Sequence, residues 1–442
     1  TIKFKYIYFA VALAALAGAC SEDFVSIDPQ GQFDSSTYFS NEQQCYAALI
    51  GVYDPLRKNT GGFENLVAML NAGSDDFYAG GGSSTDGTGI QNFSTHSLSS
   101  ITIPASYWND HYQGISRANI LLSKLPAASM DDAVRSRFAA EAKTLRAFYY
   151  FNLVRMIKNI ALVLEPLTTE KIYNPEQVAP EVIYAQIEKD LQEASAVLNP
   201  VASQKGRATK GAAMSFLGKV YLYQNKFTEA AATFDEVIAS GSYSLTPSYV
   251  DLFSVANENN SETVFDVQYT GLEGGSYGCL ICLEGNAAVG FQGIRQYNGP
   301  IYGDGNSYNL PTKNLYDAFA STDIRRDATV LDLDAFIAKQ ANPADIKYAK
   351  GAGGHTGYYN NKYIKRQTEI GLPDNDLTSP VNYKVIRYAD VLLMAAEAYA
   401  RKASPDENKA KTYLNMVRKR VNLSDVGLFS DGTAVKQVGS ET

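Results

Sequence analysis

Two stretches of this 442-residue sequence combine tyrosine, asparagine and aspartate with many glycines, a mixture found in adaptable binding surfaces. A tyrosine offers an apolar ring face and a hydrogen-bonding hydroxyl, so it can hold a ligand that is partly apolar and partly polar. The residues that we expect to bind a ligand are Asp75, Tyr78 and Asn92 in the first stretch, and Tyr277, Tyr297, Asn298, Tyr302 and Tyr308 in the second. Each also has a structural interpretation, because loop tyrosines often anchor a loop to its scaffold and an aspartate can cap a helix or order a turn.

Catalysis and metal binding find little support in the sequence. The zinc motif His-Glu-x-x-His and the phosphate loop Gly-x4-Gly-Lys are absent, although a pair of glycosidase carboxylates could be hidden among the 47 acidic residues. The three histidines are isolated, so the pair Cys279 and Cys282 lacks partners for a zinc site. We predict no enzyme, no metal and no cofactor, and the cysteine pair forms either a loop disulfide or two unreactive thiols.

The N-terminus has the pattern of a secretory signal. Lys3 and Lys5 precede an apolar stretch, residues 6–16, that is too short to cross a bilayer. Small residues then lead directly to Cys20, which resembles the lipobox of bacterial lipoproteins, where the cysteine thiol is lipidated after cleavage. We expect residues 1–19 to be a signal peptide and Cys20 to carry a lipid anchor, and the acidic residues 21–23 resemble an export signal to the outer cell face. The alternative is an ordinary cleaved signal with a chance cysteine.

Helices must position these candidate residues. Closely spaced small and apolar residues over 41–58 predict a tightly packed helix. Apolar residues recur at spacings of three and four over 131–158 and 180–200, which predicts two more helices with an apolar face. Met214, Leu217, Gly218 and Tyr221, followed by Ala230 and Phe234, match the tetratricopeptide pattern with Met in the place of Trp. A looser hairpin is predicted over 388–421. Because one hairpin cannot bury its own faces, we predict a mainly α fold, an α-α superhelix of tetratricopeptide-like hairpins.

Loop-rich segments interrupt this helical pattern. Residues 71–106 show no steady period and are predicted as one long loop, which is usually functional in a compact protein. Residues at about 241–383 mix glycine, asparagine and tyrosine with short strand-like runs such as 263–269, and predict a loop-rich lobe with a small amount of β structure inserted into the scaffold. Residues 20–442 are therefore expected to form one domain.

The formal charge of −8, without a long basic run, argues against a nucleic-acid partner.

Several stretches are similar to signatures of the SusD/RagB family, nutrient-binding lipoproteins of the outer membrane in Bacteroidetes. They are WNDHYQGISRANILL at 108–122, EAKTLRAFYYF at 141–151, YVDLF at 249–253, LYDAF at 315–319 with DIRR at 323–326, and RYADVLLMAAEA at 387–398. The sequence departs from the family pattern at residues 157–162, and it ends without the Glu-Arg-Arg and Arg-Trp-Phe-Asp-Leu stretches that close these proteins. We therefore expect that the C-terminal part is missing from this sequence.

The resemblance implies a lipid-anchored protein of the cell surface that covers a SusC-type, TonB-dependent transporter, with the helices facing the transporter. The opposite, loop-rich face would bind an oligosaccharide, or a peptide in the RagB branch. Sugar recognition favours an aromatic platform, and the only tryptophan, Trp108, lies in an expected core helix, which weakens the glycan interpretation relative to the peptide one. The alternatives of another class are a tetratricopeptide scaffold for protein partners and a glycoside hydrolase.

Overall fold

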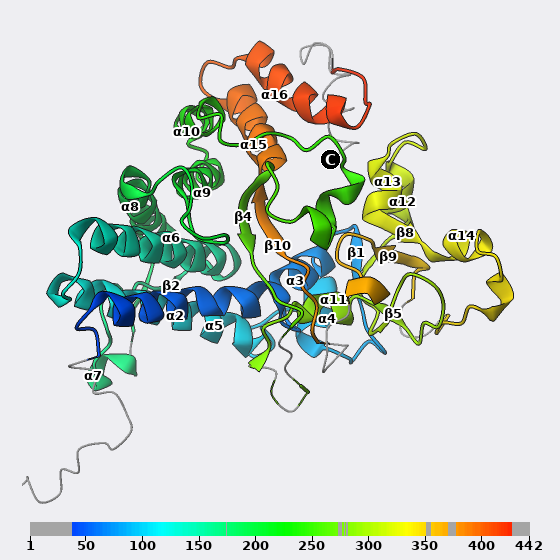
Figure 1. Ribbon diagram of the computed structural model, residues 1–442, viewed down its shortest axis with the longest axis horizontal. Coiled ribbons are helices and arrows are strands. Elements are labelled where there is room, and N and C mark those ends of the chain that lie inside the picture. Colours follow the sequence, from blue (N-terminus) through cyan, green and yellow to red (C-terminus); the bar gives the residue numbers. More distant parts are fainter. Residues whose placement is uncertain are drawn as a thin grey trace, which may run out of the picture.

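The computed structural model describes residues 38–173, 175–272, 276–277, 279, 282–350, 355–369 and 377–426. The predicted signal peptide and Cys20 lie outside these residues. Two parts make up the described chain: a scaffold of long helices, and a lobe of short elements on one side of it (Figure 1).

The scaffold is a series of helices in which each helix packs against the next along the chain. Its members are α2 (Glu42–Gly61), α5 (Ala105–Lys124), α6 (Asp132–Ile157), α8 (Pro180–Val197), α9 (Lys210–Tyr223), α10 (Phe227–Ala239), α15 (Tyr388–Arg401) and α16 (Glu407–Arg420). Capping residues define where several of these helices begin. The side chains of Asn41 and Asp131 accept hydrogen bonds from backbone N–H groups in the first turns of α2 and α6, and Pro180 is the first residue of α8. The predicted superhelix of helix hairpins is confirmed.

Close helix packing explains the tetratricopeptide pattern in α9 and α10. A Cβ atom on Gly218 would lie 2.5 Å from the Phe234 ring, so only glycine allows these two helices to approach so closely. Ala230 is fully buried on the facing side of α10. The second predicted hairpin is formed by α15 and α16, in which Ala395 and Ala410 are buried.

Buried ion pairs tie scaffold helices together. The Arg146 guanidinium donates to both carboxylate oxygens of Asp190, at 2.8 and 2.7 Å, and to Asn119, which links α5, α6 and α8. Glu141 on α6 forms a similar buried pair with Arg207.

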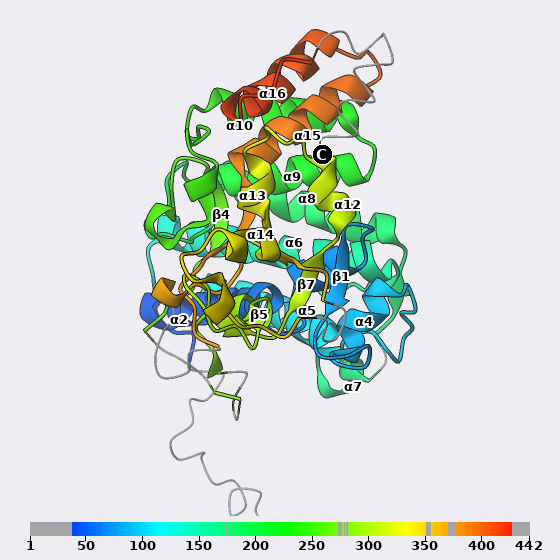
Figure 2. The same ribbon diagram turned by 90° about the vertical axis from the view of Figure 1, so that its right-hand side faces the viewer.

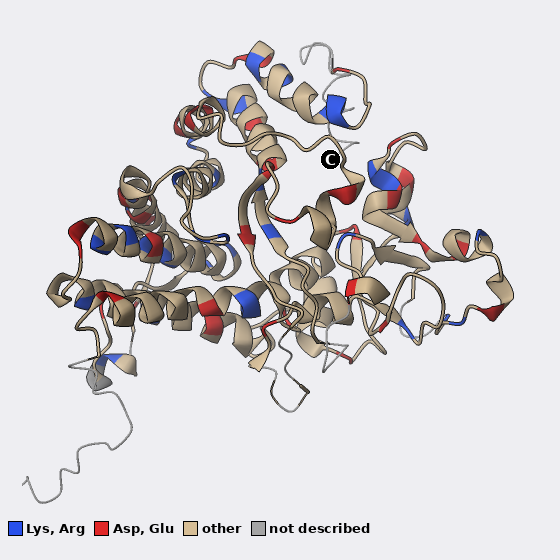
Figure 3. Ribbon diagram, viewed as in Figure 1, with Lys and Arg blue, Asp and Glu red and all other residues tan. Residues whose placement is uncertain are grey.

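Elsewhere basic and acidic residues are interspersed over the ribbon (Figure 3). None of the helices in the described ranges is long and apolar enough to cross a membrane.

Short elements form the lobe. The helices are α3 (Leu66–Ala72), α4 (Thr88–Ser94), α7 (Thr169–Ile172), α11 (Ala287–Phe291), α12 (Lys313–Ala318), α13 (Arg325–Thr329) and α14 (Leu333–Ala338), of which α7 lies on the scaffold side. The strands are β1 (Phe77–Gly80), β2 (Ile160–Ala161), β3 (Gln177–Val178), β4 (Thr263–Val267), β5 (Ile294–Arg295), β6 (Asp304–Gly305), β7 (Tyr308–Pro311), β8 (Val330–Asp332), β9 (Tyr358–Asn360) and β10 (Tyr383–Arg387). Of these, the paired β2 and β3 lie beside α6 on the scaffold side. They pair as five two-stranded sheets within the described residues: β1 with β7, β2 with β3, β4 with β10, β5 with β6 and β8 with β9.

The antiparallel pair of β4 and β10 connects the lobe to the scaffold, because β4 leads into the lobe and β10 leads directly into α15. The lobe has a small core of its own, separate from the main core of the scaffold. Its buried members are Ile294, Tyr297, Tyr302, Leu310, Leu331, Leu333, Tyr359 and Ile364. The lobe surface therefore rests on packed side chains.

Candidate ligand-binding surface

The structure brings the two candidate stretches of the sequence together in one ribbon, formed by β1 and β7. These strands pair antiparallel, with Tyr78 opposite Leu310 and Gly80 opposite Tyr308 (Figure 2). The segment predicted as one loop over 71–106 is thus partly ordered by a strand more than two hundred residues away. The prediction of one long loop was wrong, because this segment contains β1 and α4, and strand pairing over such a distance leaves no local sequence pattern.

The ribbon presents Tyr78 to solvent. The side chain is 52% exposed, whereas the following Ala79 and Gly80 are buried. Asp75, just before the strand, is also exposed, and its side chain is not the cap of any helix that the structure describes. An exposed aromatic ring with carboxylates at the same strand end supplies an apolar platform and hydrogen-bond acceptors, which suits a ligand rich in hydroxyl groups.

Glycines at the end of β1 make room for the opposite strand. Gly80 and Gly81 have φ angles of +75° and +84°, which favour glycine. A Cβ atom on Gly80 would lie 2.1 Å from the Ser307 carbonyl oxygen, and one on Gly81 would lie 2.8 Å from the Tyr308 ring. Gly80 and Gly81 are therefore required for this close strand approach.

A polar cluster closes the end of the ribbon. The Tyr308 ring is buried, and its hydroxyl hydrogen-bonds to Asp86, which also accepts the Gly82 N–H at 2.7 Å. A guanidinium nitrogen of Arg295 lies 3.5 Å from the same carboxylate and donates to the Asn306 carbonyl. Burial alone would raise the pKa of Asp86, but these hydrogen bonds and the Arg295 charge hold the pKa below its ordinary value. Asp86 stays ionised and fixes the turn that follows β1.

Two of the predicted ligand tyrosines are part of the lobe core. Tyr297 and Tyr302 are each 6% exposed, with ring centroids 6.3 Å apart in an edge-on arrangement. The Tyr297 hydroxyl donates to the Pro300 carbonyl at 2.9 Å. Asn298 is exposed, and its backbone forms a bridge with Lys347. These contacts match the structural interpretation, in which loop tyrosines anchor the loop.

Asn92 and Tyr277 are not part of the β1–β7 ribbon itself, although α4, which carries Asn92, packs beside β1. Asn92 is half-buried on α4 and accepts a hydrogen bond from Ser97. Tyr277 is 57% exposed beside the disulfide that joins Cys279 and Cys282. Of the two alternatives for the cysteine pair, the structure thus has the loop disulfide.

Sequence reasoning overlooked several residues of this region. Asp86 and Arg295 carry no local pattern, because they meet only through the pairing of β1 with β7. A row of amides under the ribbon was missed for the same reason: Asn71 donates to Asn309, and both Asn309 and Asn360 donate to Gln292. The signal that could have been noticed is the triple glycine, which marks a close backbone approach.

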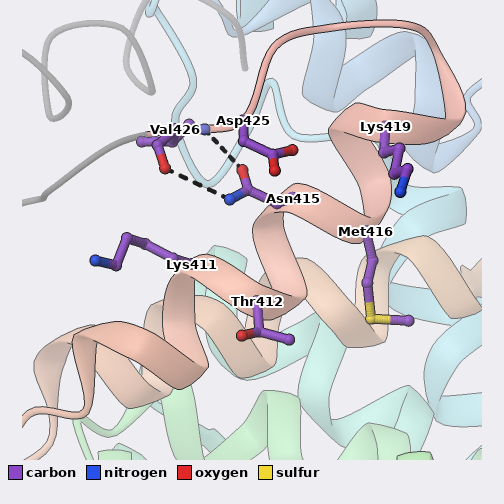
Figure 4. A pocket seen from close by; sticks show the side chains of 7 residues that line it. All are labelled: Lys411, Thr412, Asn415, Met416, Lys419, Asp425 and Val426. Atoms are coloured by element: carbon purple, nitrogen blue, oxygen red, sulfur yellow. Dashed lines mark hydrogen bonds between the residues drawn. The ribbon is translucent and has the colours of Figure 1, made fainter.

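Two further features of the molecule resemble sites. A groove of about 560 Å³ lies on the outer side of α16, where Asn415 exchanges two hydrogen bonds with the backbone of Val426 (Figure 4). None of the predicted ligand residues lines it. Residues 274–278 have the spacing Gly-x-Ser-x-Gly of a hydrolase nucleophile motif, and Ser276, which the structure describes, forms a bridge with Cys279.

Comparisons with known proteins agree over nearly the whole chain. Residues 223–438 match the model described as "SusD family", and residues 43–222 match "Starch-binding associating with outer membrane". The SusD-like protein P2 of Formosa agariphila is 27% identical over 95% of this chain and 82% of its own length.

Solved structures share this fold. A "Laminarin binding SusD-like protein" is 41% identical, with a TM-score of 0.83, over 91% of this chain and 90% of that one. Surface glycan-binding protein A from Bacteroides thetaiotaomicron, solved in complex with laminarihexaose, has a TM-score of 0.80 and 23% identity over 91% of this chain and 87% of its own. With matching models, sequence and fold, the chain belongs to the SusD family.

Proposed function

We propose that this protein is a cell-surface glycan-binding protein that delivers oligosaccharides to a SusC-type, TonB-dependent transporter of the outer membrane. The observation that carries the proposal is the 41% identity, over nine tenths of both chains, to a protein named for laminarin binding. A β-glucan of the laminarin type is therefore the first ligand to test. The lipid anchor at Cys20 and the transporter follow from the family resemblance.

We place the glycan on the surface around the β1–β7 ribbon, with Tyr78 as the aromatic platform and Asp75 as a hydrogen-bonding neighbour. An exposed ring offers its face to the apolar side of a sugar, and carboxylates accept hydroxyl hydrogens. Tyr277 and Asn298 are further exposed candidates, while Asn92, Tyr297, Tyr302 and Tyr308 support the surface from below. Binding without catalysis is expected, since the solved relatives are named for glycan binding.

Affinity electrophoresis of the purified chain in gels that contain laminarin, starch or no polysaccharide tests this proposal. Retardation by laminarin supports it, and the reducing ends released in the same samples measure hydrolysis. Retardation by neither polysaccharide, with saturable binding of oligopeptides in calorimetry, would instead favour the RagB-like alternative. Release of reducing ends would favour a glycoside hydrolase.

A further inference from the structure

A second groove, on the scaffold, is formed by one face of α9 and one face of α15. It measures about 410 Å³ and is lined by Lys219, Leu222, Tyr223, Asp390, Leu393, Met394 and Glu397. In each helix these residues recur at intervals of three and four positions, so they lie on the same side of the helix. We call it the α9–α15 groove; α9 and α15 are neighbours in the scaffold (Figure 1).

The walls of the groove are fixed. The Tyr223 ring is 51% exposed, yet it stands edge-on to the Phe151 ring at 5.1 Å, and Arg155 donates to its hydroxyl at 3.3 Å. Leu222, Leu393 and Met394 pack against the main core and are half-buried, so they form an apolar floor. An aromatic wall over an aliphatic floor is a surface on which protein side chains pack.

The acidic residues of the groove form ion pairs, whereas its lysine does not. Asp390 is paired with Arg387 at 3.4 Å, and Glu397 is paired with Arg401. Lys219 is half-buried and forms neither an ion pair nor a hydrogen bond with any side chain in the described ranges. Burial and the nearby Arg155 charge lower the pKa of Lys219, and the opposing influence of Tyr223 and Asp390, with which Lys219 forms no ion pair, offsets only part of this lowering.

We propose that the α9–α15 groove binds an extended protein segment that places a carboxylate on Lys219 and aliphatic side chains on Leu393 and Met394. A carboxylate from a partner would restore the interactions that the half-buried ammonium lacks. The apolar floor excludes a free inorganic anion as the natural occupant, since such an ion leaves Leu393 and Met394 uncovered. This inference is independent of glycan binding on the lobe.

Selection from a phage-displayed library of random dodecapeptides on the purified full chain tests the groove. The enriched peptides should share an aspartate or glutamate within a few residues of leucine, isoleucine or valine. One labelled peptide is then titrated by fluorescence anisotropy. Lys219→Met should weaken its binding about tenfold, and Lys219→Arg should restore most of it.

Lys210→Met is the matched control, because Lys210 is an exposed lysine at the start of the same helix. It should bind the peptide like the unaltered chain, and laminarin retardation should be unchanged in all variants. Protection of Lys219 from amine acetylation by the bound peptide, followed by mass spectrometry, tests the contact without any substitution.

Three results would overturn the proposal. The first is a selection that enriches no peptide or only peptides without an acidic residue. The second is equal binding by the unaltered chain and Lys219→Met, or an acetylation rate of Lys219 that the peptide leaves unchanged. The third is a concentration-dependent dimer in sedimentation that Leu393→Asp abolishes, which would assign the groove to a second copy of this chain.

Discussion

Replacing Tyr297 separates a structural role of this ring from a role in ligand binding. The side chain is 6% exposed in the core of the lobe, and its hydroxyl donates to the Pro300 carbonyl. Truncating a buried aromatic ring costs about 3–5 kcal/mol of unfolding free energy, because its packing contacts are lost and a cavity remains. Tyr297→Ala should therefore destabilise the lobe by this amount, and Tyr297→Phe, which removes only the hydrogen bond, by about 1 kcal/mol.

Urea denaturation followed by circular dichroism measures these changes, and calorimetry with a laminarin oligosaccharide measures affinity at a temperature where each variant is folded. Folded Tyr297→Phe should bind like the unaltered chain. Tyr78→Ala should behave in the opposite way, with stability within about 0.5 kcal/mol and weakened binding, because its ring is exposed. A Tyr297→Phe variant of unchanged stability and lost affinity would refute the assignment of this ring to the core.

Three further predictions concern the fold. Asp190→Ala should lower the unfolding free energy by about 3–5 kcal/mol in urea denaturation, because it leaves the buried guanidinium of Arg146 without its carboxylate; an unchanged midpoint would contradict this. Burial raises the pKa of Glu258 to about 6 from an ordinary value of 4.5, so the stability contributed by its protonated form is complete below pH 4.5 and is lost as the pH rises through 6. Glu258→Gln should remove this loss and add about 1 kcal/mol at pH 7, after allowance for solvent screening, with no gain at pH 4. Gly218→Val should lower the thermal midpoint, at a cost of about 2–3 kcal/mol, because its side chain would overlap the Phe234 ring; calorimetric melting without a shift would exclude the close helix approach.

The helical scaffold could be predicted from the sequence because its signals are local. The predicted range 131–158 agrees with α6, which spans Asp132–Ile157, since the spacing of apolar residues and the capping Asp131 both belong to the same segment. The tetratricopeptide hairpin was found for a similar reason. Gly218 and Phe234 are only sixteen positions apart, and their types reflect one contact.

The ligand surface was harder to predict because its residues meet through long-range pairing. Tyr78 and Tyr302 both stand among glycines and polar residues, yet one ring is 52% exposed and the other 6%. The amino-acid composition of a loop indicates that it can bind a ligand. Which tyrosine rings face solvent is decided by the pairing of β1 with β7 and by the packing of the lobe core. Asp86 and Arg295 were missed for this reason.

Calorimetric titration of laminarihexaose into the unaltered chain, Tyr78→Ala and Tyr173→Ala tests the central claim most directly. Tyr173 is the matched control, since its ring is 78% exposed and follows α7 on the scaffold. Saturable binding that Tyr78→Ala weakens about tenfold and Tyr173→Ala leaves unchanged is the predicted result. Absence of binding by the folded unaltered chain, or equal binding by all three, would contradict a laminarin-type glycan site on the β1–β7 ribbon.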